Sequence, residues 1–117
     1  MANELPNVWD IPPVVRGNGL SFDLRIYGSG GSATNLSGAT VGMAISSNPY
    51  FSGTGDLYLY DGSGLSMDRS EGLIYIRMTA TNIDSLPIYT PSFYKINIEE
   101  VGLQPVTYVQ GKISVNG

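Results

Sequence analysis

The chain of 117 residues contains no cysteine and no histidine. Without cysteine no disulfide can form, so stability must come from packing. Zinc sites built on cysteine or histidine are excluded. The same absences exclude Ser-His-Asp and Cys-His catalysis, and a histidine switch near neutral pH. We therefore expect no cofactor and no metal.

Charge is also scarce. The chain has 6 Lys and Arg against 10 Asp and Glu, which gives a net charge of -4. A protein that follows nucleic-acid phosphates or an anionic membrane surface needs a basic patch instead. No apolar run approaches the about 18 residues of a membrane span. Residues 1–6 lack the basic and apolar regions of a signal peptide. We expect neither nucleic acid nor a membrane as a partner.

Small and aromatic residues are abundant. Fifteen Gly, seven Pro and eight Tyr are typical of short strands joined by tight turns. The length suits one domain. We expect an N-terminal arm over residues 1–10 and a single β domain over residues 11–117.

Alternation of apolar and polar residues supports this fold class. After the turn signal Ser37-Gly38, the side chains of Val41, Met43 and Ile45 fall on one face of residues 40–46, so these residues predict a half-buried strand. Other segments predict further strands: residues 20–27, 57–60, 64–68, 73–80, 93–100 and 107–115. About seven strands at this spacing indicate an all-β sandwich or a small barrel.

Two local features are also predicted. Thr81, with Asp84 three residues later, reads as the N-cap of a single helical turn over residues 81–87. Gly111 reads as the position of a β-bulge in the last strand.

Several segments together resemble a family of small immunoglobulin-like domains of tailed bacteriophages, which includes the N-terminal domain of upper baseplate proteins and related small tail proteins. The similarity extends from about residue 11 to residue 115. It is carried by short runs: VRGN at 15–18 with LSFDL at 20–24, LSGATV at 36–41, GLIYI at 72–76 with the 81–87 turn, and YKINI at 94–98 with GKISV at 111–115.

The resemblance implies an immunoglobulin-like antiparallel β-sandwich of about seven to eight strands. It implies a non-enzymatic structural protein of a phage virion, synthesised in the host cytoplasm and acting in the tail or baseplate. The partners would be other virion proteins and copies of the chain itself. Residues 49–55 and 58–60 depart from the family's pattern, so decoration of the capsid head stays open as an alternative.

Aromatic side chains are the candidate contact residues, since Tyr and Trp are enriched at protein interfaces. Tyr58 and Tyr60 share one strand face, and Tyr75 points away from the apolar face of its strand. Cross-strand packing would account for the tyrosines equally well, and Trp9 could instead plug one end of the fold. The candidates are Trp9, Tyr58, Tyr60, Tyr75 and Tyr108.

Two other classes of function remain open. A carbohydrate-binding module for host attachment would use tyrosines as stacking platforms on an open face. An enzyme would need a cleft with two carboxylates about 5–10 Å apart. Acidic residues between positions 56 and 71 could hold calcium, but their spacing does not match an EF-hand loop, and solvated turns are the better interpretation.

Overall fold

Strands make up most of the computed structural model, which describes residues 7–26, 36–51, 55–100 and 106–116. A 3-10 turn, η1 (Arg69–Glu71), and one helical turn, α1 (Ala80–Asp84), interrupt them. The strands are β1 (Asn7–Val8), β2 (Val14–Val15), β3 (Leu20–Arg25), β4 (Thr40–Ser46), β5 (Leu57–Asp61), β6 (Gly64–Asp68), β7 (Leu73–Met78), β8 (Ser92–Glu99), β9 (Val106–Ile113) and β10 (Val115–Asn116).

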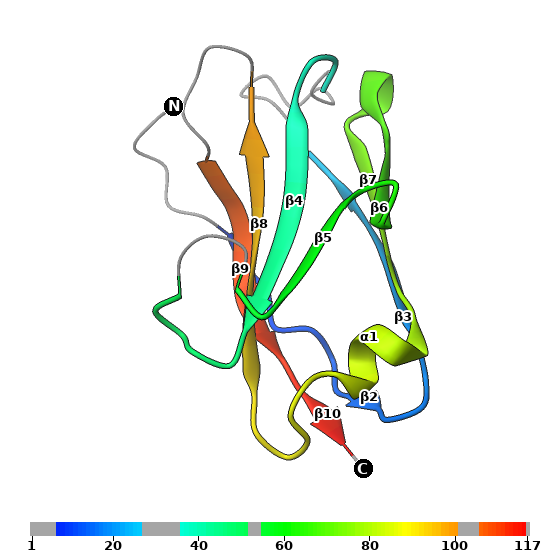
Figure 1. Cartoon of the computed structure of the whole chain (residues 1–117). Coiled ribbons are helices and arrows are strands. Elements are labelled where there is room, and N and C mark those ends of the chain that lie inside the picture. The colour runs from blue at the N-terminus through cyan, green and yellow to red at the C-terminus, as the bar shows by residue number, and fades with distance from the viewer. Residues whose placement is uncertain (1–6, 27–35, 52–54, 101–105, 117) are drawn as a thin grey trace.

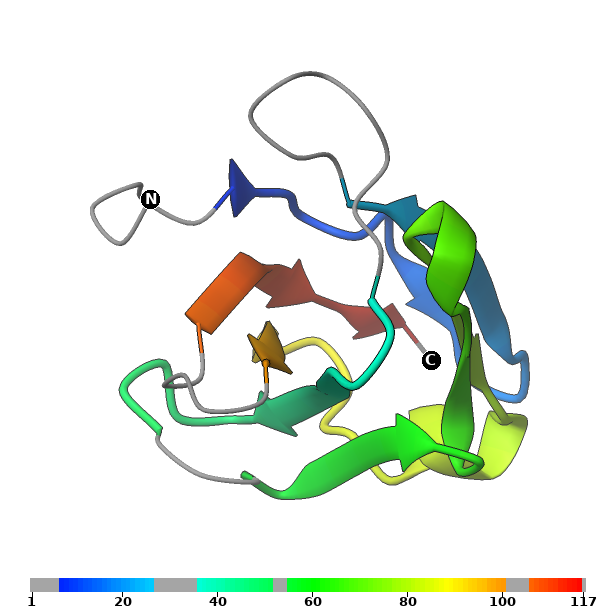
Figure 2. The same cartoon turned by 90° about the horizontal axis from the view of Figure 1, so that it is seen from above.

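Eight of these strands form one sheet in the order β1-β9-β8-β4-β5-β6-β7-β3, and β10 pairs with β2 in a second, small sheet. Figure 1 shows β4, β8 and β9 on one side of the molecule and β3, β6 and β7 on the other. From above, the large sheet curls around the interior (Figure 2). The expected all-β, sandwich-like fold is confirmed.

The sheet is mixed, whereas the resemblance implied an antiparallel sandwich. β1 runs parallel to β9, β2 to β10, and β5 to β6. Gly62 in the connection and Gly64 at the start of β6 explain that pair, because they have φ of 91° and 83°. Glycine adopts such positive φ angles easily. They allow the chain to turn while β6 keeps the direction of β5, which a hairpin turn would reverse.

β4 lies at the centre of the sheet and is buried from Val41 to Ser46. Val41, Met43 and Ile45 face the main core, as predicted. The expectation of a half-buried strand is wrong, because the face that carries Gly42 and Ala44 is covered as well. Tyr58 lies over Gly42 on this face. The alternation within residues 40–46 could not show that a side chain from another strand buries this second face.

Two local predictions need correction. The N-cap of α1 is Thr79, whose hydroxyl accepts a hydrogen bond from the Asn82 N–H in a capping box, so the helical turn begins earlier than Thr81 suggested. The bulge lies at Tyr108, because β8 and β9 pair Ile96 with Val109 and then Asn97 with Thr107. Gly111 is regularly paired.

Residues 7–16, the N-terminal edge segment, lie along β9 and β10. The N–H groups of Trp9 and Ile11 each donate to a β9 carbonyl at 2.9 Å, and the Val14 N–H donates to Ser114 O. Pro12 and Pro13 lie between these contacts. Proline has no backbone N–H to donate, which suits the point where the segment passes from the large sheet to the small one. Residues 7–10 of the expected arm therefore lie on a sheet edge; residues 1–6 fall outside the described residues.

Candidate protein contact surfaces

The tyrosine face consists of Tyr58 and Tyr60 on β5. Side chains alternate along a strand, and Leu59 between them is buried in the core. The two tyrosine rings lie 6.0 Å apart, centroid to centroid, with their planes 24° from parallel. Tyr58 is 36% exposed and Tyr60 is 52% exposed. The sequence predicted that these two residues share a face, and the structure brings them together in one stack.

Gly42 of β4 determines how Tyr58 lies. A Cβ at this position would meet Tyr58 Oη and its ring carbons far inside van der Waals contact. The phenol end of Tyr58 therefore extends across the sheet and rests on the backbone of the neighbouring strand. Sequence reasoning missed this role of Gly42, although an isolated glycine inside a strand is a known signal of close approach.

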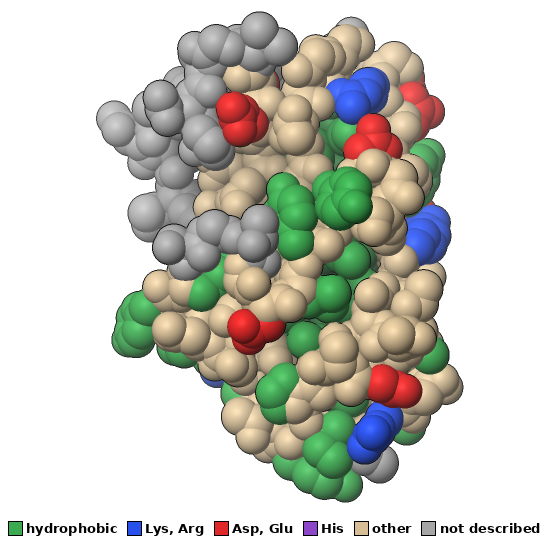
Figure 3. Space-filling view, viewed as in Figure 1, with side chains coloured by type: hydrophobic (Ala, Val, Ile, Leu, Met, Phe, Trp, Pro, Cys, Tyr) green, Lys and Arg blue, Asp and Glu red, His purple; other side chains and the backbone are tan. Residues whose placement is uncertain are grey.

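Charged and hydrogen-bonding groups border the tyrosine face. On β8, Lys95 donates to Phe51 O at 3.0 Å and lies over the Phe51 ring, and Asn97 accepts from the Thr107 hydroxyl at 2.6 Å. Figure 3 shows hydrophobic side chains gathered over β5, with charged groups around them. The result is an exposed apolar area with hydrogen-bonding groups nearby.

The other tyrosine candidates lie elsewhere. Tyr75 is partly buried on β7, where the Arg77 guanidinium lies 5.5 Å from its ring centroid. Arg77 also forms an ion pair with Asp23 of β3 at 2.8 Å. Tyr108 is partly buried at the bulge and packs against the core. Neither residue joins the tyrosine face.

Trp9 lies between the two ends of the curled sheet. It is 43% exposed. Its indole meets the ring of Phe22 on β3 edge-on, with centroids 5.2 Å apart. Trp9 therefore contacts the opposite end of the sheet and still presents an open surface.

Tyr94 holds the backbone of Trp9 in place. Its buried hydroxyl donates to Trp9 O at 2.5 Å. The same carbonyl lies so close to Gly111 that any side chain there would collide with it. Burial, and to a lesser degree the nearby charge of Asp10, raises the pKa of Tyr94 to about 12. The sequence signal for this contact was that the inward-facing Tyr94 lies opposite Gly111 on the neighbouring strand.

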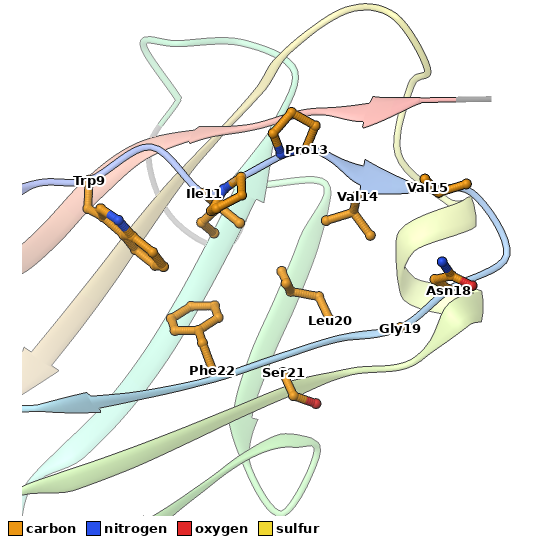
Figure 4. Close-up of a pocket in the computed structure, with 11 residues that line it drawn as sticks. Trp9, Ile11, Pro13, Val14, Val15, Asn18, Gly19, Leu20, Ser21 and Phe22 are labelled. Carbon is orange, nitrogen blue, oxygen red and sulfur yellow. The ribbon is translucent and has the colours of Figure 1, made fainter.

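An apolar groove of about 420 Å³ runs between the N-terminal edge segment and the start of β3. Figure 4 shows Trp9, Ile11 and Val14 on one wall, with Leu20 and Phe22 opposite. Asn18 and Ser21 add polar groups at its margin. The groove follows from the curl of the sheet, because the two walls are not joined by backbone pairing.

Two further tyrosines are more exposed than any candidate. Tyr50 is 90% exposed and Tyr89 is 75% exposed. Tyr89 has a φ of 62°, which is uncommon for a residue with a side chain. Both lie in connecting segments outside the named strands.

The acidic residues between positions 56 and 71 are partly engaged with protein groups. Asp56 accepts from the Ser47 N–H at 3.0 Å, and Asp61 pairs with Arg69 at 3.4 Å. Within the described ranges, no three acidic side chains come close enough together to hold a metal ion. No helix in the described part of the chain is long and apolar enough to span a membrane.

Comparison with known protein families finds no family that matches this chain, and comparison with curated proteins finds no match either.

Proposed function

We propose that this protein is a non-enzymatic structural component that acts through protein–protein contacts at the tyrosine face. The observation that carries the proposal is the stacked, exposed pair Tyr58 and Tyr60, of which Tyr58 lies against Gly42 in the middle of the large sheet. A partner that covers these rings would bury apolar area and gain from it.

The rigidity of the site supports this proposal. β5 is paired on both sides, with β4 and with β6. Tyrosine has few rotatable bonds, and a ring already held against a backbone loses little freedom when a partner binds. These properties are those of an interface core.

The proposed setting is the virion of a tailed phage, with the tail or baseplate favoured over head decoration. This part of the proposal rests on the resemblance of the sequence runs at 15–24, 36–41, 72–76, 94–98 and 111–115 to phage immunoglobulin-like domains. The partners would be neighbouring virion proteins and copies of this chain. Repetition by symmetry would multiply a modest contact into a stable assembly.

The test is incorporation of variants into phage particles. Tyr60→Ser removes the more exposed ring and leaves Tyr58 over Gly42, so the domain should stay folded. We expect reduced incorporation for Tyr60→Ser and a larger loss for the double variant Tyr58→Ser/Tyr60→Ser. The double variant should also lose about 1–2 kcal/mol of unfolding free energy, since Tyr58 covers part of the sheet.

The matched control is Tyr50→Ser/Tyr89→Ser, which removes two more exposed tyrosines from other segments. Normal incorporation of this control, together with loss for Tyr60→Ser, supports the assignment. Normal incorporation of Tyr58→Ser/Tyr60→Ser would show that the tyrosine face is not the contact surface.

A second candidate function is glycan binding for host attachment. It is favoured by one observation: the rings of Tyr58 and Tyr60 are within 24° of parallel on an exposed face. Such rings can stack against sugar rings, and Asn97 and Thr107 could supply hydrogen bonds. A glycan array probed with the native chain and with Tyr60→Ser decides this. Binding that Tyr60→Ser abolishes supports the glycan function, and no binding to any glycan contradicts it.

A further inference from the structure

β3 is a terminal strand of the large sheet and pairs with β7 along one edge. The Ile26 N–H donates to Gly72 O at 2.8 Å, toward the β7 side. Backbone groups alternate in direction along an antiparallel strand. The N–H and C=O groups of Ser21, Asp23 and Arg25 therefore point to the other edge, where the described residues provide no strand partner.

The inner face of β3 is incompletely covered. Leu20, Phe22 and Leu24 are only partly buried, whereas Ile74 and Ile76 on the paired strand β7 are fully buried. The difference follows from position, because among the described residues β3 has a neighbouring strand on one side only. Another strand added to this edge would cover the remaining apolar area.

The two halves of β3 differ in their surroundings. Gly19 to Phe22 face the apolar groove, and Trp9 contacts Phe22. The groove lining on this strand ends at Phe22 and includes none of the residues from Asp23 to Ile26. The backbone from Asp23 to Ile26 is therefore the part of the edge that lies outside the groove.

The outer face of this half carries two exposed residues of opposite charge, Asp23 and Arg25. In an antiparallel pair of identical strands with Leu24 opposite Leu24, Asp23 of each strand lies directly opposite Arg25 of the other. On the inner face, Phe22 lies opposite Ile26. The segment is therefore complementary to itself in both charge and hydrophobicity.

We infer that β3 is a self-association edge, at which a second copy of this chain pairs in an antiparallel manner about a two-fold axis at Leu24. The charges select this register. A two-fold axis at Asp23 would place two aspartates opposite each other, and one at Phe22 would leave Arg25 opposite Gly19. In the inferred register, Asp23 contacts Arg77 of its own chain and Arg25 of the second copy.

The competing hypothesis is that these charges protect the edge and keep β3 unpaired, as charged residues do on many edge strands. The self-association edge is also independent of the tyrosine face, because it lies on a different strand at the end of the sheet. Either surface can fail its test without affecting the other.

Cysteine cross-linking of the full chain tests the register. The native sequence has no cysteine, so a single introduced thiol reports on its own position. In the inferred dimer, Leu24 of one copy and Leu24 of the other form a non-hydrogen-bonded pair. Their Cα atoms would be about 4.5 Å apart, within the range for a disulfide. Under mild oxidation we expect a covalent dimer for Leu24→Cys and little for Phe22→Cys, Asp23→Cys or the exposed control Ser66→Cys.

Charge reversal tests the same contact without a core substitution. Arg25→Glu should weaken dimerisation by about tenfold or more in sedimentation equilibrium, because two attractive pairs become repulsive. Arg16→Glu is the control. It changes the net charge by the same amount and should leave dimerisation unchanged. Asp23→Lys/Arg25→Glu restores opposite charges across the edge and should recover part of the affinity.

The inference is overturned if the native chain sediments as a monomer at the highest concentrations it reaches in solution, which is the outcome that edge protection predicts. It is overturned equally if a dimer forms but cross-links through Phe22→Cys or Asp23→Cys in preference to Leu24→Cys.

Discussion

Two glycines in the sheet leave space for groups from neighbouring segments, one for a tyrosine side chain and the other for a backbone carbonyl. Gly42 accommodates the phenol end of Tyr58, and Gly111 accommodates the carbonyl of Trp9, which Tyr94 binds. In the first case the crowding group is the end of a flexible side chain. In the second it is backbone that β9 also holds by hydrogen bonds. The two sites should therefore respond differently to an added methyl group.

Gly42→Ala should change the unfolding free energy by less than about 1 kcal/mol, since Tyr58 can swing away. Gly111→Ala should cost about 2 kcal/mol or more, because the N-terminal edge segment must be displaced. Denaturant unfolding of the two variants measures the difference. Equal costs would show that the N-terminal edge segment is not fixed at Gly111.

Tyr94→Phe removes the hydroxyl that donates to Trp9 O and should cost about 1 kcal/mol at neutral pH. The pKa of Tyr94 is raised from 10.0 to about 12 in the folded chain. The neutral phenol therefore stabilises the fold fully below pH 10, and this contribution is lost as the pH rises from 10 to 12.

Unfolding curves of the native chain and Tyr94→Phe between pH 8 and 12 test this sign. The advantage of the native chain should be constant up to about pH 9 and shrink above pH 10. An advantage that grows with pH in that range would contradict the burial of a neutral hydroxyl at Trp9 O.

The local pattern predicted which residues face inward but not what lies on the outer side. Leu59, Ile74, Ile76, Ile96 and Ile98 are buried as their alternation indicated. The contacts of Gly42 and Gly111 join strands that are distant in sequence, so no short window contains both partners. For the same reason the sequence could place Tyr58 and Tyr60 on one face but could not show that they stack.

At the scale of elements, the helical turn α1 is held by its cap. Thr79 and Asn82 exchange two hydrogen bonds across the first turn, at 3.1 and 2.9 Å. A turn this short gains little from its own helical hydrogen bonds. The cap and the burial of Ile83 in the core must therefore fix its position.

Thr79→Ala should lower the unfolding free energy by about 1 kcal/mol. Thr81→Ala is the matched control, since Thr81 is exposed within the turn and should change stability by less than about 0.5 kcal/mol. The reverse order of costs in thermal or denaturant unfolding would support the N-cap that the sequence suggested.

The existence of the seven longer strands, β3 to β9, was predictable at this scale, because alternation over several residues is typical of a strand and does not fit the period of a helix. The two-residue strands β1, β2 and β10 are too short to leave such a pattern. Strand partners were not predictable. The parallel pairs of β1, β2 and β6 depend on where the chain turns after Asp61 and how residues 7–16 meet β9 and β10. Those outcomes are set by glycine φ angles and by long-range backbone pairing, which leave no periodic signal.

At the scale of the whole molecule, a curled mixed sheet presents three surfaces. The tyrosine face lies over its middle, the groove lies between its ends, and β3 is the terminal strand at one edge. A domain built in this way can contact several neighbours at once. That property suits a repeated part of a large assembly.

The most direct test of the central claim, that this chain is a structural part of a phage particle, is immunogold electron microscopy of purified particles of the phage that encodes it. We expect label at the tail tip or baseplate, at a fixed position in every particle. Label over the whole head would move the protein to capsid decoration. Absence of label from every particle would contradict the claim.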